Sequence, residues 1–346
     1  MAIVRPNARE LQGRFLLRVF QACAVNQQFQ MAATGVTRFG LPKSSIGEAW
    51  IPLPSTSEQC AIADFLDRET AKIDTLVAKK RTLIERLKEK RTALISRTVT
   101  SGLPPDAARA AGLDAHPKLK PSGIDWLDEI PKHWEVLPFT KYVIERADYR
   151  GKTPEKTQDG VFLVTARNVR VGYIDYESSQ EYVAENEYEE IMRRGLPRIG
   201  DILFTTEAPL GNVALIDRED IELAQRIIRF RMKPDYFDAT FTLYGMMSDH
   251  FQTQLQSLST GSTAEGLKAS KLPILRIVAP PLKEQAVIGA FLDRETAKID
   301  AMVAKVEIAI ERLQEYRTAL ITAAVTGKID VRGHTADNAR EAAAAA

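Results

Sequence analysis

The ten residues "FLDRETAKID" occupy Phe65–Asp74, and the same ten letters return at Phe291–Asp300. The two copies lie 226 positions apart (291 − 65), and the match continues at this offset on both sides. When Glu58–Thr100 is set against Glu284–Thr326, about two thirds of the aligned positions are identical. Internal repetition of this extent indicates a duplicated structural module.

Both copies read as long helices. Apolar residues recur at spacings of three and four with charged residues between them, which is the pattern of a coiled-coil seam. At a rise of 1.5 Å per residue, some forty residues make a rod of about 60 Å. One apolar stripe cannot be buried alone, so we expect the two copies to pack on each other. The residues expected in the seam are Phe65, Leu66, Ile73, Leu76, Leu83, Leu87, Leu94, Phe291, Leu292, Ile299, Met302, Val306, Leu313 and Leu320.

The sequence between the two copies is different in kind. After Thr100 a stretch rich in Pro and Gly predicts a linker that ends in a docked hook around Trp126 and Trp134. Short β-like runs follow, and then a helical stretch at 241–258. This order favours an α+β fold, with one globular domain of about 180 residues flanked by helical rods. The β-like runs are 161–169, 201–205, 212–217 and 226–232.

The repeat also extends upstream of the helices. At the same offset Ala33–Ser45 matches Ser259–Lys271, and Met1 falls opposite Ile227, inside the later module. We therefore expect the chain to begin within a module, and its first 57 residues to be partly disordered or to expose apolar surface. The expected order is a remainder of a first globular domain (1–57), a helical repeat (58–101), a linker (102–125), a globular domain (126–283), a second helical repeat (284–328) and a disordered tail (329–346).

Composition excludes several classes of protein. The 346 residues include 47 Lys+Arg and 46 Asp+Glu, and this balance does not itself argue for nucleic acid. No apolar run is long enough to span a membrane, and the first residues lack the apolar core of a signal peptide. Two cysteines, Cys23 and Cys60, cannot form a disulfide framework and fit a reducing compartment. We expect a cytoplasmic protein.

Motifs for catalysis are missing from the sequence. Gly151–Thr153 reads GKT, but Arg146 stands where a phosphate-binding loop needs glycine. There is no Gly-x-Ser-x-Gly and no Gly-rich dinucleotide turn, and the His and Cys residues lack metal-ligand spacing. The asparagine-proline-proline-aromatic motif of DNA amino-methyltransferases is also absent. We expect no enzymatic activity, no cofactor and no metal.

Residues suited to nucleic acid are easier to find. Arg and Asn can fork onto base edges in the major groove, while Lys and Thr commonly hold phosphates. Such residues cluster in "RGKTPEK", in "TARNVR" and at the turn "TGST". Taken singly, each of them is better explained by a soluble surface or a plain turn than by a DNA contact. The candidate DNA contacts are Arg150, Lys152, Lys156, Arg167, Asn168, Arg170, Thr260, Gly261, Ser262 and Thr263.

Together these segments resemble a known family. In order, the chain contains "SGIDWLDEIPKHWEV", "GDILFT", "STGST", "PPLKEQ" and "YRTALITAAVTGKI". The combination resembles the specificity subunits of type I restriction–modification systems along nearly the whole chain. The resemblance implies a target-recognition domain that reads double-stranded DNA, and helices that pair antiparallel as a spacer. It also implies a methyltransferase (modification) subunit and a restriction (motor) subunit as partners, and no catalysis by the chain itself.

The resemblance is incomplete at the start of the chain. A whole specificity subunit would carry a full first recognition domain before Glu58, and the Trp hook occurs here only once, at Trp126–Trp134. Three explanations stay open: two copies pair, another chain supplies the missing piece, or the gene is a degraded fragment. The alternative function is a coiled-coil scaffold without a DNA role.

Overall fold

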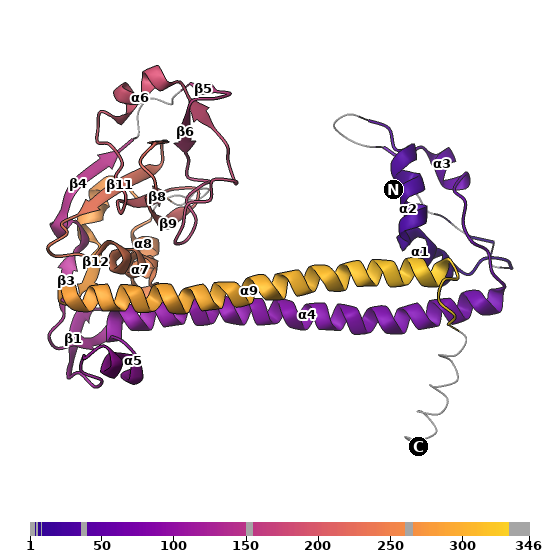
Figure 1. Ribbon diagram of the computed structural model, residues 1–346, viewed down its shortest axis with the longest axis horizontal. Helices are drawn as coiled ribbons and strands as arrows, with labels where there is room; N and C mark the ends of the chain where they lie inside the picture. Colours follow the sequence, from indigo (N-terminus) through magenta and orange to yellow (C-terminus); the bar gives the residue numbers. More distant parts are fainter. Residues whose placement is uncertain are drawn as a thin grey trace. The chain divides into compact units, whose positions relative to one another are not determined.

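The computed structural model describes residues 4, 6–7, 9–35, 40–149, 155–259 and 266–331. The chain forms two compact units. Unit 1 comprises Met1–Arg86 and Ala301–Ala346, and unit 2 comprises Leu87–Asp300. Two long helices, α4 (Thr56–Ser101) and α9 (Leu282–Val325), each contribute to both units (Figure 1). The predicted pair of long helices is therefore confirmed, within an α+β fold.

The seam of α4 follows a heptad pattern with alternating steps of four and three residues. Ile73, Val77 and Ile84 on this stripe are each at most 8% exposed. The prediction was wrong for three other residues, which are about 42–44% exposed on the outer sides of the helices. Two of them stand one position before the buried residues Val77 and Ile84, and the third stands one position before the residue that lies 226 positions after Val77. Because a helix turns about 100° per residue, each side chain lies outside the seam. These three residues are Leu76, Leu83 and Met302.

The two helices run antiparallel and make the same ion pair in each unit. In unit 2, Arg91 Nε lies 3.0 Å from Asp300 Oδ1, and in unit 1, Arg317 Nε lies 2.9 Å from Asp74 Oδ1. Adding 226 converts Asp74 into Asp300 and Arg91 into Arg317. We call residues related by this offset repeat equivalents. The duplicated sequence thus builds a duplicated contact.

Short helices continue this equivalence beyond the long ones. Unit 1 contains α1 (Gly13–Gln21) and α2 (Cys23–Ala32), and unit 2 contains α7 (Ala239–Met247) and α8 (Asp249–Leu258). Adding 226 to the bounds of α1 and α2 gives the bounds of α7 and α8. Unit 1 also holds α3 (Lys43–Gly47), and its equivalent in unit 2 is the 3-10 helix η2 (Ala269–Ile274). The first 57 residues therefore retain part of a module.

A buried glutamine at the start of each long helix joins the preceding chain to it. Gln59 and its equivalent Gln285 are at most 1% exposed. Each side-chain amide donates to two backbone carbonyls and accepts from one backbone N–H, at 2.7–3.0 Å. The carbonyls belong to Glu10 and Pro54 in unit 1 and to Tyr236 and Pro280 in unit 2, and the N–H groups to Gln12 and Asp238.

Unit 2 adds the strands. One antiparallel sheet has the order β4-β11-β8-β9, and a second has the order β10-β6-β7-β5, in which only the β10–β6 pair is parallel. Two further strand pairs are β1-β2 and β12-β3. The four predicted β-like runs all contain strands. The strands are β1 (Leu119–Ile124), β2 (Leu127–Pro131), β3 (Glu135–Pro138), β4 (Val143–Asp148), β5 (Lys156–Thr157), β6 (Val161–Val164), β7 (Tyr182–Val183), β8 (Ile202–Thr206), β9 (Leu210–Leu215), β10 (Ile221–Leu223), β11 (Ile227–Met232) and β12 (Arg276–Ala279).

Three remaining elements complete unit 2. The segment predicted as a linker, 102–125, contains α5 (Pro105–Ala110) and strand β1, so it is structured. The 3-10 helix η1 (Phe139–Tyr142) follows β3, and α6 (Glu185–Met192) follows β7. Of the two tryptophans in the predicted hook, Trp134 is fully buried and Trp126 is 43% exposed.

The main core of unit 2 lies between sheet β4-β11-β8-β9 and the helices α7 and α8 (Figure 1). Aromatic rings fill it, with Phe139 edge-on to Phe230 at 5.0 Å and to Phe251 at 5.8 Å between centroids. A second core joins the other sheet to the outer side of the first one. Burial of these large aromatic side chains stabilises unit 2.

In unit 1 the helices have no such sheet over them among the described residues. Phe15 and Val19 on α1 are fully buried, yet Leu17 is 56% and Trp50 88% exposed. The expected exposure of apolar surface in the first 57 residues is thus observed, while their described part forms three helices. Val331, in the segment predicted as a disordered tail, is only 5% exposed and packs on the core of unit 1.

Candidate nucleic-acid interface

Several strand ends of unit 2 meet around one hollow of about 400 Å³. Sheet pairing causes this meeting, because Ile227 at the start of β11 pairs with Thr205 at the end of β8. The N–H of Ala224 also donates to the carbonyl of Val164 at the end of β6. Side chains that follow these strand ends therefore line the same hollow. Polar and charged residues in its lining are Lys156, Thr165, Arg167, Glu181, Gln225 and Arg226.

The rim of the hollow carries three exposed cations, which differ in whether they form an ion pair. Lys156 Nζ lies 2.8 Å from Glu181 Oε2, and Arg226 Nε lies 2.9 Å from Glu207 Oε1. The guanidinium of Arg167 is exposed and has no ion pair or hydrogen bond to another described residue. Arg226 and Glu207 are both exposed, and such a pair contributes little to stability, so Arg226 can exchange this carboxylate for another anion at small cost; Glu181, in the other pair, is only 20% exposed.

Arg226 stands in an unusual backbone conformation. Its φ is +72°, in the left-handed region, and Ala208 across the hollow has a φ of +47°. Such conformations cost a non-glycine residue energy and persist where the surrounding contacts hold them. Here the carbonyl of Arg226 accepts from both the N–H and the hydroxyl of Thr206, at 2.9 and 3.2 Å. These two hydrogen bonds fix the direction in which the Arg226 side chain leaves the sheet.

A buried ionic network stiffens the same sheet. Arg229 is fully buried and bonds to the carboxylates of Glu145 and Asp201, and Arg231 bonds to both carboxylates as well. Burial lowers the pKa of Arg229, but hydrogen bonds to Tyr149 and Glu145 outweigh it and hold this pKa above its ordinary value. Arg229 therefore stays charged, and removal of a carboxylate partner would leave its buried charge uncompensated. The network supports the strand ends rather than offering free cations.

One predicted contact has a structural role instead. Asn168 is fully buried, and its Oδ1 accepts from the N–H and the hydroxyl of Thr165 at 2.9 and 2.8 Å. Its Nδ2 donates to the carbonyls of Asp175 and Ser179. The prediction of Asn168 as a base contact was wrong, because every polar atom of its amide is used to hold the loop after β6.

The other predicted contacts divide into two groups. Arg170 is exposed beside Asp175, with 3.4 Å between Nε and Oδ2, on a loop that also exposes Tyr173. Lys156 and Arg167 belong to the hollow. Six candidates lie outside the described residues, namely Arg150, Lys152, Thr260, Gly261, Ser262 and Thr263.

The described residues that flank these six candidates reach the same end of the sheet. Asp148, just before the first gap, pairs with Ile228 on β11. Gly266, just after the second gap, forms a bridge with Glu207, and the next residue's N–H donates to the Thr206 carbonyl at 3.0 Å.

Sequence reasoning missed Gln225, Arg226 and Glu207. Arg226 was visible as the first letter of the β-like run "RIIRFRM", and a cation at the start of a strand was the only available signal. Its proximity to Arg167, 59 positions earlier (226 − 167), depends on pairing between strands that are distant in sequence. Among the described residues no group of His, Cys, Asp and Glu could hold a metal ion, and no helix is long and apolar enough to cross a membrane.

Comparison with known proteins gives consistent matches. Residues 150–312 match the family model of the type I restriction modification DNA specificity domain. The type I restriction enzyme MjaVIII specificity subunit of Methanocaldococcus jannaschii is 26% identical over 91% of this chain and 71% of its own length. The EcoBI specificity subunit of Escherichia coli is 23% identical over 86% of this chain and 62% of its own length.

A solved structure has a similar fold. It comes from a study of complex assembly and conformational transition of the type I R-M system, and it superposes with a TM-score of 0.61 at 17% identity. The superposition covers 93% of this chain and 73% of that chain. At this identity the likeness concerns the fold alone.

Proposed function

Because the chain belongs to the family of type I restriction–modification specificity subunits, we propose that unit 2 reads a DNA sequence with the rim of the hollow. The observation that carries this proposal is the convergence of Lys156, Arg167 and Arg226 from three separate strand ends. The chain acts as a cytoplasmic, non-catalytic subunit. It positions the methyltransferase and restriction subunits of the complex on double-stranded DNA.

Each cation of the rim has a chemical role in this proposal. A guanidinium forks onto O6 and N7 of guanine, so Arg167 and Arg226 supply sequence readout in the major groove. Lys156 is a point charge suited to a phosphate. Glu207 and Glu181 keep the two paired cations in place until DNA replaces them, and Glu207 can then accept from the amino group of cytosine. Arg170 extends this surface, and the six candidates outside the described residues stay predictions as DNA contacts.

The long helices carry the assembly role. Each unit presents the same exposed cluster of ion pairs, one turn long, on its copy of the repeated sequence. Lys72 Nζ lies 2.9 Å from Glu69 Oε1, and the equivalent Lys298–Glu295 distance is 2.8 Å. Arg68 and Arg294 flank these pairs in the same way. We assign this duplicated surface to docking of the methyltransferase subunit.

The test is DNA binding by the full chain together with its methyltransferase partner. Selection from a random duplex pool should return a defined sequence, and affinity should fall steeply with salt because each neutralised phosphate releases a counterion. Arg226→Gln should weaken binding to the selected site by about 5- to 150-fold, the value of one bidentate base contact. Lys156→Gln should instead weaken binding to all sequences and reduce the salt slope by about one.

Arg109→Gln is the matched control. Arg109 lies on α5, is paired with Asp106 and has an exposed side chain outside the hollow. We expect the Arg109→Gln variant to bind DNA with the same affinity and sequence specificity as the unmodified chain. If no salt-dependent binding occurs even with the methyltransferase present, the proposal fails and the scaffold function stands in its place.

A further inference from the structure

The loop that leads away from Arg167 carries an exposed apolar turn between Val169 and Ile174. Val171 and Tyr173 in this turn are 52% and 59% exposed. The Tyr173 hydroxyl has no hydrogen bond to another described residue. Single exposed apolar side chains are ordinary on a protein surface. Here an aliphatic and an aromatic side chain are exposed together at the tip of one turn.

Hydrogen bonds fix this turn to the edge strand β9. The N–H of Gly172 donates to the Val213 carbonyl at 2.8 Å, and Asn212 Nδ2 donates to the Val169 carbonyl at 2.8 Å. Val169 and Ile174 also form an antiparallel bridge across the turn. A turn fixed in this way presents its tip in one conformation. Binding through the tip therefore costs little conformational entropy.

Strand β9 sets the spacing between the turn and the hollow. The strand begins at Leu210, two residues after Ala208 in the lining of the hollow, and Val213 lies three residues further along. Three residues of a strand extend about 10 Å. The major groove of B-DNA is about 12 Å wide and the minor groove about 6 Å. An element about 10 Å from the centre of a major groove thus lies beyond its edge, at the phosphate backbone and the adjoining minor groove.

The charges around the turn favour DNA as the molecule that it contacts. Arg167 and Arg170 are exposed on the same loop, and Arg167 has no ion pair with another described residue. Arg170 faces one carboxylate, that of Asp175, at 3.4 Å. Cations next to an exposed aromatic ring are typical of nucleic-acid surfaces, because the cations meet phosphates while the ring meets the faces of bases.

We propose that Val171 and Tyr173 form an apolar wedge that inserts between two base pairs from the minor groove, at a step beside the bases read by the hollow. The wedge rests on the proposed function of unit 2, since it acts only on bound DNA. Partial unstacking costs least at pyrimidine–purine steps such as TA and CA. The wedge therefore gives the chain a sequence preference at a position where no hydrogen bond reads a base.

The test uses the full chain, its methyltransferase partner and the selected duplex. The fluorescent adenine analogue 2-aminopurine is placed in turn at each step beside the selected bases, and its emission should rise at the one step where stacking is lost. Tyr173→Ala should abolish this rise and weaken binding by about 5- to 150-fold, the value of one aromatic stacking contact. The salt slope should not change, because the substitution removes no charge. Tyr173→Phe should bind as the unmodified chain does, because it keeps the ring.

A change in the DNA provides a second measurement. A stiffer step in place of the flexible one should weaken binding of the unmodified chain several-fold. The same change should leave binding of Tyr173→Ala unaltered, because this variant no longer deforms the step. Trp126→Ala is the matched control, since Trp126 is an aromatic residue that is 43% exposed outside this loop. Its affinity, emission and step preference should equal those of the unmodified chain.

The outcomes separate the wedge from the proposed function. If no duplex binds in a salt-dependent manner, the proposed function fails and the wedge fails with it. If Arg226→Gln weakens binding while Tyr173→Ala binds as the unmodified chain does, only the wedge is overturned. A rise in emission that persists in Tyr173→Ala comes from base flipping by the methyltransferase, and this result also overturns the wedge.

Discussion

The helix pair α1–α2 of unit 1 and the helix pair α7–α8 of unit 2 have equivalent bounds and different surroundings. Phe15 and its equivalent Phe241 are both fully buried against the long helices. Their neighbours Leu17 and Leu243 differ tenfold in exposure, at 56% and 5%. The inner layer of a module is therefore complete without its sheet. The sheet is a second layer, added on the opposite face of the same helices.

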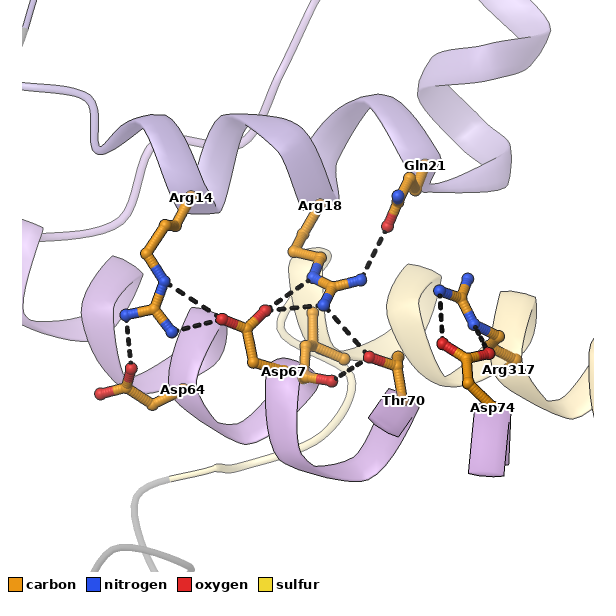
Figure 2. A network of polar contacts seen from close by, with 9 residues as sticks. Arg14, Arg18, Gln21, Asp64, Asp67, Thr70, Asp74 and Arg317 are labelled. Carbon is orange, nitrogen blue, oxygen red and sulfur yellow. Dashed lines mark hydrogen bonds and ion pairs between the residues drawn. The ribbon is translucent and has the colours of Figure 1, made fainter. Parts of the chain in front are cut away.

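The two pairs also differ in the polar tie to the long helix. In unit 2, Tyr244 Oη donates to Asp293 at 2.8 Å and lies 3.0 Å from the Thr296 hydroxyl. In unit 1 its equivalent, Arg18, makes the same two contacts with Asp67 and Thr70 (Figure 2). Burial raises the pKa of Tyr244 to about 12, so this tie stays neutral beneath the sheet. A guanidinium suits the open unit, where water still reaches the pair.

The largest difference in stability between the two units is expected when tryptophan is substituted. Trp134→Ala should destabilise unit 2 by about 3–5 kcal/mol, because it leaves a cavity at a fully buried site. Trp50→Ala should change the stability of the isolated chain by less than about 0.5 kcal/mol, because that ring is 88% exposed. Denaturant unfolding of both variants measures the difference. Equal losses would mean that Trp50 is already covered in solution.

The leucine pair tests the same point on the helices. Leu243→Ala should cost about 2–4 kcal/mol, since the side chain is enclosed by the sheet. Leu17→Ala should cost much less, about 0.5 kcal/mol, for a half-exposed side chain. Thermal unfolding with hydrogen exchange as a local probe separates the two units. A large loss for Leu17→Ala would show that the α1–α2 face has an occupant.

Mild acid should destabilise unit 2 but not unit 1. Burial lowers the pKa of His250 on α8 to about 4, and its equivalent in unit 1 is Ala24, which does not titrate. The unfolded chain takes up a proton near pH 6.5 and the folded chain does not. Unit 2 should therefore lose about 1–2 kcal/mol between pH 6.5 and pH 5. Urea unfolding across this range measures the loss, and His250→Gln should remove it while unit 1 is unaffected.

Stronger acid should act on unit 1 by a smaller amount. Hydrogen bonds from Arg14 and Arg18 hold the pKa of Asp67 below its ordinary value (Figure 2). The stabilisation is present above the unfolded pKa near 4 and is lost as the pH falls through the lower, folded value. Its size should stay below about 1 kcal/mol, because the carboxylate is 41% exposed. Asp67→Asn should remove this step from the acid unfolding curve, and an unchanged curve would contradict the assignment.

Much of the fold could be predicted from local pattern. Heptad spacing gave the long helices, and short apolar runs between turn residues gave the strands around Val161, Ile202 and Ile227. The exact seam was less accessible, since Leu76 and Val77 are equally apolar and only the partner helix selects between them. The site was harder still. Lys156 and Arg167 were recognised by residue type, but Asn168 was misassigned because burial of its amide depends on a loop that closes eleven residues later.

The sequence by itself determined that this protein is built from a duplicated module, because identical heptads and identical capping residues must form identical helices. The equivalence of Gln59 and Gln285 follows from the letters alone. Only the tertiary structure decided which faces are covered. The strands that cover α7 pair with partners dozens of residues away in the sequence. The hydrogen bond from Thr206 to the Arg226 carbonyl forms only because two such strands, β8 and β11, lie side by side. Local sequence determines whether a segment forms a helix or a strand, whereas the burial of that segment depends on which other segments pack against it.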